Sequence, residues 1–149
     1  MRLINTLTLK LSEFYDENIP RYAILSHTWG TDEISYTQYE IMSGDSSIPT
    51  TSKIASCCRL AASQSWHWLW VDTCCIDKTS SAELTESINS MYRWYEKAEV
   101  CYAYLSDLSL KVSNEGTGGK LFRDSRWFTR GWTLQELLAP ACVLFYDQG

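Results

Sequence analysis

The chain has 149 residues, of which 45% are hydrophobic and 21% are charged, and its formal net charge is -5. A chain of this length is typical of one domain that buries roughly two-thirds of its unfolded surface, and the composition excludes a disordered protein. The acidic balance argues against nucleic-acid binding, because affinity for a phosphate backbone depends on clustered lysines and arginines. We therefore expect a single globular domain over residues 1–149.

Targeting signals and metal-binding patterns are missing from the sequence. No apolar run approaches the roughly 20 residues that cross a bilayer, and the amino terminus lacks the basic segment and apolar core of a signal peptide. We expect a cytoplasmic protein without membrane insertion. Most of the six cysteines lie in apolar segments, where thiols in a reducing compartment act as small core residues. With no C-x-x-C and two histidines, the sequence favours no metal site.

The first third of the chain predicts an edge element, a buried strand, a loop and a helix. Apolar and polar residues alternate up to Leu11, which predicts a short strand or hairpin at a sheet edge. A continuous apolar run over 22–25 is typical of a strand covered on both faces. Residues 31–49 are polar and predict a loop, whereas 51–65 predict an amphipathic helix.

Two more buried strands are predicted in the middle of the chain, over 68–71 and 100–105, because both runs are continuously apolar. Between them, Ser80 and Glu83 have the spacing of a capping box, which predicts the start of a second helix. The apolar stripe of that helix comprises Leu84, Ile88, Met91 and Tyr95. Residues 113–120 hold three glycines and predict a surface loop.

The segment Ser125–Pro140 gathers aromatic residues, two arginines and one carboxylate around a third predicted helix. With a start near Thr129, the spacing places Thr129, Trp132 and Glu136 on one face. The opposite face, at the spacing of a stripe packed into a core, carries Leu134, Leu137 and Leu138. A carboxylate beside an indole is not needed for core packing, so Glu136 is a candidate for chemistry.

The alternation of strands and helices, which ends with a fourth strand over 142–146, predicts an α/β fold: a three-layer parallel sheet with helices on both faces. In such sheets, ligands bind beyond the carboxyl ends of the strands. The polar residues that follow those ends are Ser26, His27, Asp72, Ser106, Asp107 and Asp147. We therefore expect a binding site at that edge of the sheet.

Each of these residues also has an ordinary structural role open to it, because Asp and Ser commonly cap helices or close turns. We favour that role for Ser106 and Asp147, while for Asp72 lining a site and capping are equally open. A structural role is favoured for His27, which would need a partner to act as a base. Trp29 is open between loop packing and an aromatic platform for a flat ligand.

Three blocks of the sequence resemble, closely and in order, the signature blocks of the fungal heterokaryon incompatibility (HET) domain. They are YAILSHTWG at 22–30, WLWVDTCCIDK at 68–78 and TRGWTLQELLAP at 129–140. The resemblance spans most of the chain, and one departure is Gln64-Ser65-Trp66, where the family commonly has a glycine turn. The family is associated with non-self recognition after fusion of unlike fungal cells, ending in programmed cell death. The resemblance implies that role here.

Through this family the chain resembles Toll/interleukin-1 receptor (TIR) domains, which have a flavodoxin-like parallel sheet. Many TIR domains cleave NAD⁺ between nicotinamide and ribose, with a glutamate in a W-C-x-x-E-L motif. Residues 132–137 resemble that motif, with Thr133 in place of its cysteine. The resemblance implies that Glu136 is the catalytic carboxylate. NAD⁺ would be a substrate and not a cofactor, since no G-x-G-x-x-G or P-loop is present.

Six residues are candidates for binding NAD⁺ or a related nucleotide: Ser26, His27, Trp29, Asp72, Arg130 and Trp132. Arg130 would pair with the diphosphate through its guanidinium, and Trp29 and Trp132 would stack on nicotinamide or adenine. We interpret Arg126 as a member of an ordinary surface pair.

A rival hypothesis is a non-enzymatic signalling module of the same fold, which self-associates through its surfaces and responds to upstream recognition proteins. In that case Glu136 is a structural helix residue. Because the sequence stops soon after the fourth strand, we also expect that a final strand or helix is missing or is supplied differently.

Overall fold

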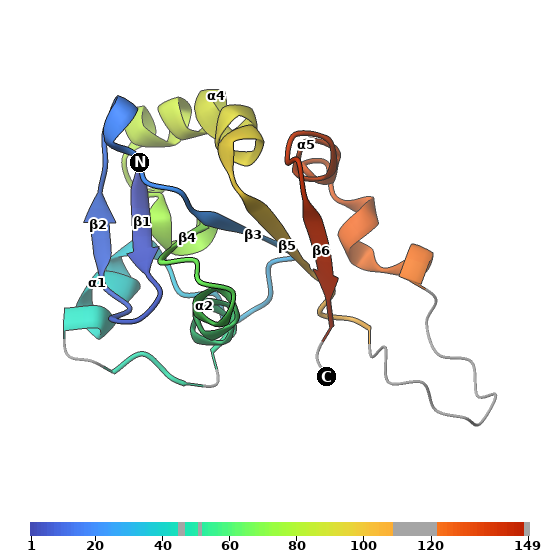
Figure 1. Ribbon diagram of the computed structural model, residues 1–149, viewed down its shortest axis with the longest axis horizontal. Coiled ribbons are helices and arrows are strands. Elements are labelled where there is room, and N and C mark those ends of the chain that lie inside the picture. The colour runs from blue at the N-terminus through green and yellow to red at the C-terminus, as the bar shows by residue number, and fades with distance from the viewer. Residues whose placement is uncertain (45–46, 51, 109–121, 148–149) are drawn as a thin grey trace.

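A mixed sheet of six strands forms the centre of the computed structural model, which describes residues 1–44, 47–50, 52–108 and 122–147 (Figure 1). The strands are β1 (Arg2–Asn5), β2 (Leu11–Glu13), β3 (Ala23–His27), β4 (Trp68–Val71), β5 (Val100–Tyr104) and β6 (Val143–Tyr146). Their spatial order is β2-β1-β4-β3-β5-β6. The predicted α/β class and the positions of the four strands predicted after the edge element are thereby confirmed.

The sheet is mixed, whereas we had predicted a parallel one. Strands β3, β4, β5 and β6 are parallel to one another, whereas β1 is antiparallel to both β2 and β4. The reason is the short link between β1 and β2, since parallel strands need a crossover of roughly a dozen residues or more. The predicted edge hairpin is confirmed, and it is this hairpin that makes the sheet mixed.

The four parallel strands meet in an order that fixes where polar groups converge. Of the parallel strands, β3 comes first in the sequence. Strand β4 lies on one side of it, and β5 and then β6 lie on the other side. Strand β3 is buried along its whole length and pairs with β5 from Ala23 to His27. The strand order therefore reverses between β3 and β5, and the carboxyl ends of these two strands mark the point where such sheets place ligands.

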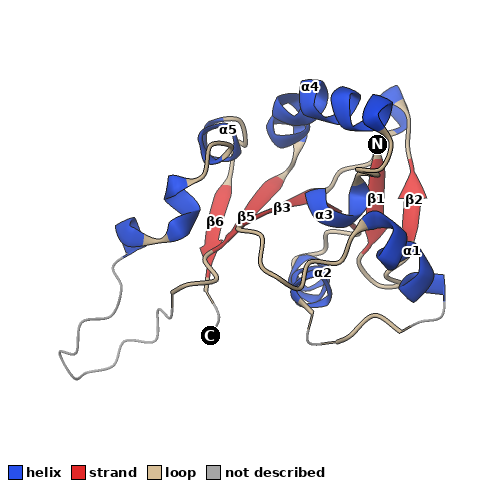
Figure 2. Cartoon of the chain, turned by 180° about the vertical axis from the view of Figure 1, so that it is seen from behind, coloured by secondary structure: helices blue, strands red, loops and turns tan. Residues whose placement is uncertain are grey.

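The helices are α1 (Tyr36–Gly44), α2 (Lys53–Ser63), α3 (Asp72–Cys75), α4 (Ser81–Lys97) and α5 (Thr133–Leu138). Three 3₁₀ turns, η1 (Asp16–Asn18), η2 (Phe122–Asp124) and η3 (Arg126–Thr129), complete the described elements. In both ribbon views, α4 and α5 lie next to each other above the central strands, while α2 lies below them (Figures 1 and 2). The glycine-rich stretch 113–120, predicted as a loop, lies outside the described residues.

Side-chain caps begin α1, α2 and α4, and the cap of α1 corrects the sequence analysis. As predicted, Ser80 begins α4 by accepting a hydrogen bond from the Glu83 N–H. Residues 31–49 are not a loop throughout, because Ser35 and Gln38 form a reciprocal capping box that begins α1. Tyr39 then anchors α1, since its buried hydroxyl donates to the Leu9 carbonyl. The S-x-x-Q spacing at 35–38 was the sequence signal for this helix.

Candidate functional site

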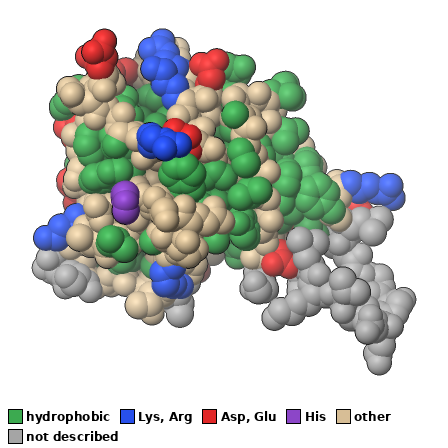
Figure 3. Space-filling model, in the orientation of Figure 1, with side chains coloured by type: hydrophobic (Ala, Val, Ile, Leu, Met, Phe, Trp, Pro, Cys, Tyr) green, Lys and Arg blue, Asp and Glu red, His purple; other side chains and the backbone are tan. Residues whose placement is uncertain are grey.

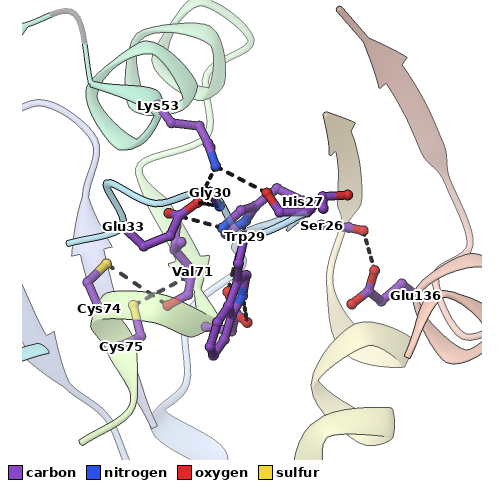
Figure 4. Close-up of polar contacts among 12 residues, drawn as sticks. Ser26, His27, Trp29, Gly30, Glu33, Lys53, Val71, Cys74, Cys75 and Glu136 are labelled. Carbon is purple, nitrogen blue, oxygen red and sulfur yellow. Dashed lines mark hydrogen bonds and ion pairs between the residues drawn. The ribbon is translucent and has the colours of Figure 1, made fainter. Parts of the chain in front are cut away.

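The carboxylate of Glu136 is buried and held by two side chains from different parts of the chain. The residue is 3% exposed on α5. The Ser26 hydroxyl, on β3, donates to its Oε2 across 2.5 Å, and Figure 4 shows the two side chains pointing toward one another. The Arg130 guanidinium binds both carboxylate oxygens in a fork, at 3.1 Å each. Ser26, Arg130 and Glu136 were all predicted as site residues, and the structure brings them into contact.

Trp127, which the sequence analysis did not single out, completes this group. Its indole lies fully buried in η3, and its Nε1–H donates to the Ser26 Oγ across 2.7 Å. The Thr133 hydroxyl donates to the Trp127 carbonyl at 2.5 Å, which ties the start of α5 to the same residue. A buried tryptophan needs an acceptor for its N–H, but the sequence could not indicate that Ser26 would supply it.

Helix α5 is turned the opposite way from the prediction. It begins at Thr133, so Thr129 belongs to η3 and Trp132 precedes the helix. Thr133 and Glu136 face inward, while the predicted core stripe is exposed: Leu134 by 66%, Leu137 by 37% and Leu138 by 65%. The reason is the polar anchoring just described, since the bonds of Glu136 and Thr133 fix which side of this short helix faces the sheet. We call these three leucines the leucine face.

Trp29 and Asp72 form a second contact between predicted site residues. The Trp29 indole N–H donates to Asp72 Oδ2 across 2.8 Å, and the Lys78 ammonium lies 3.8 Å from the centre of the Trp29 ring. Burial lowers the pKa of Lys78, although the neighbouring Asp72 acts in the other direction. Asp72 thus orients an aromatic ring that is half exposed. Lys78 adds a cation that was not among the predicted site residues.

His27 lies behind this pair, between two carboxylates. Its Nε2 is 3.4 Å from Glu33 Oε2, and its Nδ1 is 3.9 Å from Asp72 Oδ1. Glu33 also contacts Lys53 and accepts from the Gly30 N–H (Figure 4). Burial alone would raise the pKa of Glu33, but the His27 and Lys53 side chains and the Gly30 N–H outweigh it and lower that pKa to about 2. The position of His27, 2% exposed, fits the favoured structural role.

A cavity of about 440 Å³ brings most of these groups together, and we call it the first cavity. A volume of this size is within the range of small-molecule sites. Its lining includes five predicted residues: Trp29, Asp72, Arg130, Trp132 and Glu136. Ser26 and His27 do not line the cavity, and each instead contacts a carboxylate that does. One wall is the predicted apolar stripe of α4, of which Ile88 remains 43% exposed because it faces the cavity and not a packed core.

Comparison with known proteins decides the family. The protein family described as "Heterokaryon incompatibility protein (HET)" matches residues 22–117, which make up more than half of the chain. The chain belongs to the HET family. It is also similar to the vegetative incompatibility protein HET-E-1 of Podospora anserina, with 46% identity over 138 residues, covering 87% of this chain and 10% of that protein. The chain therefore spans about a tenth of that relative's length. No solved structure matches the chain.

The family match covers one part of the candidate site of this HET domain. Residues 22–117 include Ser26, His27, Trp29 and Asp72, whereas Arg130, Trp132 and Glu136 lie after them. The site thus joins strand ends inside the matched region to a helix beyond it. Its two halves meet through the Ser26–Glu136 hydrogen bond.

The thiols of the HET domain are unpaired and mostly buried. Cys142 is exposed, and the other five cysteines lie in the interior. Burial raises the pKa of Cys58 to about 12 and that of Cys74 well above its ordinary value, which makes these thiols unreactive core groups. Over the described ranges, no group of three or more His, Cys, Asp or Glu side chains is placed to hold a metal ion. None of the helices described has the length and apolarity to pass through a bilayer.

Proposed function

We propose that this HET domain is the effector part of a fungal incompatibility protein and that it hydrolyses NAD⁺ at the bond between nicotinamide and ribose. The observation that carries the proposal is the buried Glu136 carboxylate at the wall of the first cavity, with the exposed rings of Trp29 and Trp132 on the same cavity. The biological role is supported by the relative HET-E-1, which is by name a vegetative incompatibility protein.

The strand order supports a flavodoxin-like relationship, including that to TIR domains. In flavodoxin-like sheets, the parallel strands lie in the order 2-1-3-4-5. The parallel strands of this chain, numbered as they occur, lie in the order 2-1-3-4. Helices lie on both sides of these strands, as a three-layer arrangement requires (Figure 1). The first cavity lies at the carboxyl end of β3, beside the reversal in strand order.

The proposed reaction requires little from the protein beyond one placed carboxylate. The bond from ribose C1′ to the pyridinium nitrogen breaks, the electron pair goes to nitrogen, and neutral nicotinamide leaves. The ribose becomes oxocarbenium-like, and water adds to C1′ with loss of a proton to give ADP-ribose. A carboxylate stabilises the positive charge or binds the ribose hydroxyls. Glu136 and Asp72 are the carboxylates that line the first cavity, and Asp72 is engaged by the Trp29 indole, so Glu136 is assigned this role.

On this proposal, substrate binding frees the Glu136 carboxylate from its ion pair with Arg130. In the structure the Arg130 guanidinium donates hydrogen bonds to both carboxylate oxygens of Glu136. A diphosphate suits the same fork of donors, and Arg130 lines the first cavity. Transfer of Arg130 from Glu136 to a substrate phosphate leaves the carboxylate bound by Ser26 alone and open to the ribose.

The test is the release of nicotinamide from NAD⁺ by the purified chain, assayed by chromatography at low and at high protein concentration. We expect nicotinamide and ADP-ribose in equal amounts. A rate per molecule that rises with protein concentration shows that assembly promotes catalysis. Folded protein that releases no nicotinamide at any concentration contradicts the proposal.

The leucine face favours a second candidate function, a non-enzymatic module that signals by self-association. Apolar side chains gather over α5 and β6 in Figure 3. On α5, Leu134 and Leu138 are each about two-thirds exposed. Large exposed apolar areas commonly mark protein interaction sites. For this candidate, sedimentation should detect oligomers that disappear on Leu138→Glu, while NAD⁺ stays intact. Upstream recognition proteins would then act by changing the assembly.

A further inference from the structure

A second, larger cavity of about 1010 Å³ lies beside the first one. The two share Thr28 and Trp29, the residues directly after β3, so they flank the same strand end. Tyr104 and Ser106, at the end of β5, also line the second cavity. The second cavity therefore lies at the reversal in strand order, between the carboxyl ends of β3 and β5, where doubly wound sheets bind nucleotides.

One short segment supplies an arginine to each cavity. Arg126 begins η3 and lines the second cavity, while Arg130 follows η3 and lines the first. Trp127 lies between them in sequence and is buried against Ser26. The two guanidinium groups thus lie on either side of one anchored turn, an arrangement that suits a ligand with anionic groups between two bulky halves.

We propose that the second cavity binds the adenosine half of the dinucleotide while the first cavity holds the nicotinamide ribose. This assignment rests on the proposed function, because it is the first cavity that contains Glu136. Arg126, with 64% of its side chain exposed, is placed to bind the phosphate of that half. Its Nε lies 3.7 Å from Oδ2 of Asp107. That carboxylate also accepts from the Ser125 hydroxyl and the Arg126 N–H, so it keeps two partners when the guanidinium turns to a phosphate.

The rest of the second cavity matches the chemistry of adenosine. Asp32 lines it and provides a carboxylate, the group that accepts hydrogen bonds from ribose hydroxyls in dinucleotide sites. Ile34, Met42 and Ile54 provide apolar surface for a flat base. The other acid in the lining, Glu33, is compensated by Lys53 and the Gly30 N–H and does not repel a phosphate as an isolated carboxylate would.

ADP tests the second cavity without catalysis, because it carries the adenosine half and the diphosphate but no nicotinamide ribose to cleave. We expect calorimetry to detect ADP binding that Arg126→Ala weakens by about tenfold or more, since hydrogen bonds to charged groups are of that strength. Arg123→Ala is the matched control, as this arginine is 80% exposed and lines neither cavity. Trp132→Ala, in the first cavity only, should leave ADP affinity unchanged.

Activity then separates this inference from the proposed function. Nicotinamide mononucleotide lacks the adenosine half, so Arg126→Ala should raise KM for NAD⁺ about tenfold and leave kcat/KM for the mononucleotide unchanged. ADP binding without nicotinamide release contradicts the proposed hydrolysis but keeps the second cavity. Failure of ADP to bind at millimolar concentration, or binding that Arg126→Ala and Arg123→Ala affect equally, overturns the inference even where NAD⁺ is cleaved.

Discussion

Ser26 is the residue on which the site depends. It lies 1% exposed on β3, accepts from Trp127 and donates to Glu136. An indole N–H can only donate, whereas a hydroxyl has one hydrogen and two lone pairs. Trp127 therefore occupies one acceptor position of Ser26, and the hydroxyl hydrogen is directed to Glu136. The carboxylate is positioned by this chain of two hydrogen bonds.

Removal of the indole N–H tests this positioning. Trp127→Phe takes away the donor to Ser26 while keeping an aromatic ring in the core. On the proposed function, we expect kcat for NAD⁺ to fall about tenfold with KM little changed, since one hydrogen bond is worth roughly 1–1.5 kcal/mol. Trp66→Phe, a half-buried position away from the cavities, is the control. Equal kcat values in the two variants contradict a positioning role.

Glu33 makes the stability of the domain depend on pH in the acid range. Its pKa is about 2 in the folded protein, against about 4.3 in an unfolded chain. A lowered carboxyl pKa stabilises the fold above the unfolded value, and this contribution is lost as pH falls from about 5 to about 2. The free energy of unfolding of wild type should therefore exceed that of Glu33→Gln at pH 7, and the gap should narrow toward pH 2. A gap that is constant with pH would exclude this role.

Sequence reasoning found some of these residues and missed others for a physical reason. Glu136 and Ser26 were predictable because one lies in a recognisable motif and the other follows a continuous apolar run. Trp127 acts through a contact that no local spacing encodes, since the Trp127–Ser26 bond spans 101 positions. Such partners become visible only when the sheet brings distant segments together.

Helix α5 shows what periodicity can and cannot predict at the scale of an element. The spacing correctly separated Glu136 from the leucines, but it could not indicate which side faces inward. The leucine spacing predicted that the leucines are buried. Instead, the hydrogen bonds of Glu136 to Ser26 and Arg130 hold the opposite side of the helix toward the sheet. In a helix of six residues, a few polar anchors outweigh a short apolar stripe.

The orientation of α5 predicts how its leucines respond to substitution. Leu134→Gln and Leu138→Gln should each change the free energy of unfolding by no more than about 0.5 kcal/mol, as is usual for exposed positions. Leu105→Gln, at a fully buried position, is the contrast and should cost several times more. Chemical denaturation provides the measurement. A loss of about 2 kcal/mol or more at Leu138 contradicts the orientation described.

At the scale of the whole molecule, continuous apolar runs predicted the strands, and alternation predicted the edge hairpin. The order of the strands was not in the sequence pattern, because it depends on which strand each crossover returns to. That order brings the ends of β3 and β5 together and places both cavities around Trp29. The convergence of polar groups at the carboxyl edge was expected from the parallel arrangement alone.

The central claim, that Glu136 of this domain cleaves NAD⁺, is tested most directly by the rate of nicotinamide release from wild type and from Glu136→Gln. Glu86→Gln on α4 is the matched control, because that glutamate is exposed and outside both cavities. Breaking a buried ion pair costs about 3–5 kcal/mol, so circular dichroism must show that the variant is folded. If it is not, Glu136→Asp keeps the charge near Arg130 while withdrawing the carboxylate.

We predict that wild type and Glu86→Gln release nicotinamide at equal rates and that the rate of Glu136→Gln, or of Glu136→Asp in its place, falls by about 10²- to 10³-fold. A folded Glu136 variant that releases nicotinamide as fast as wild type contradicts the claim.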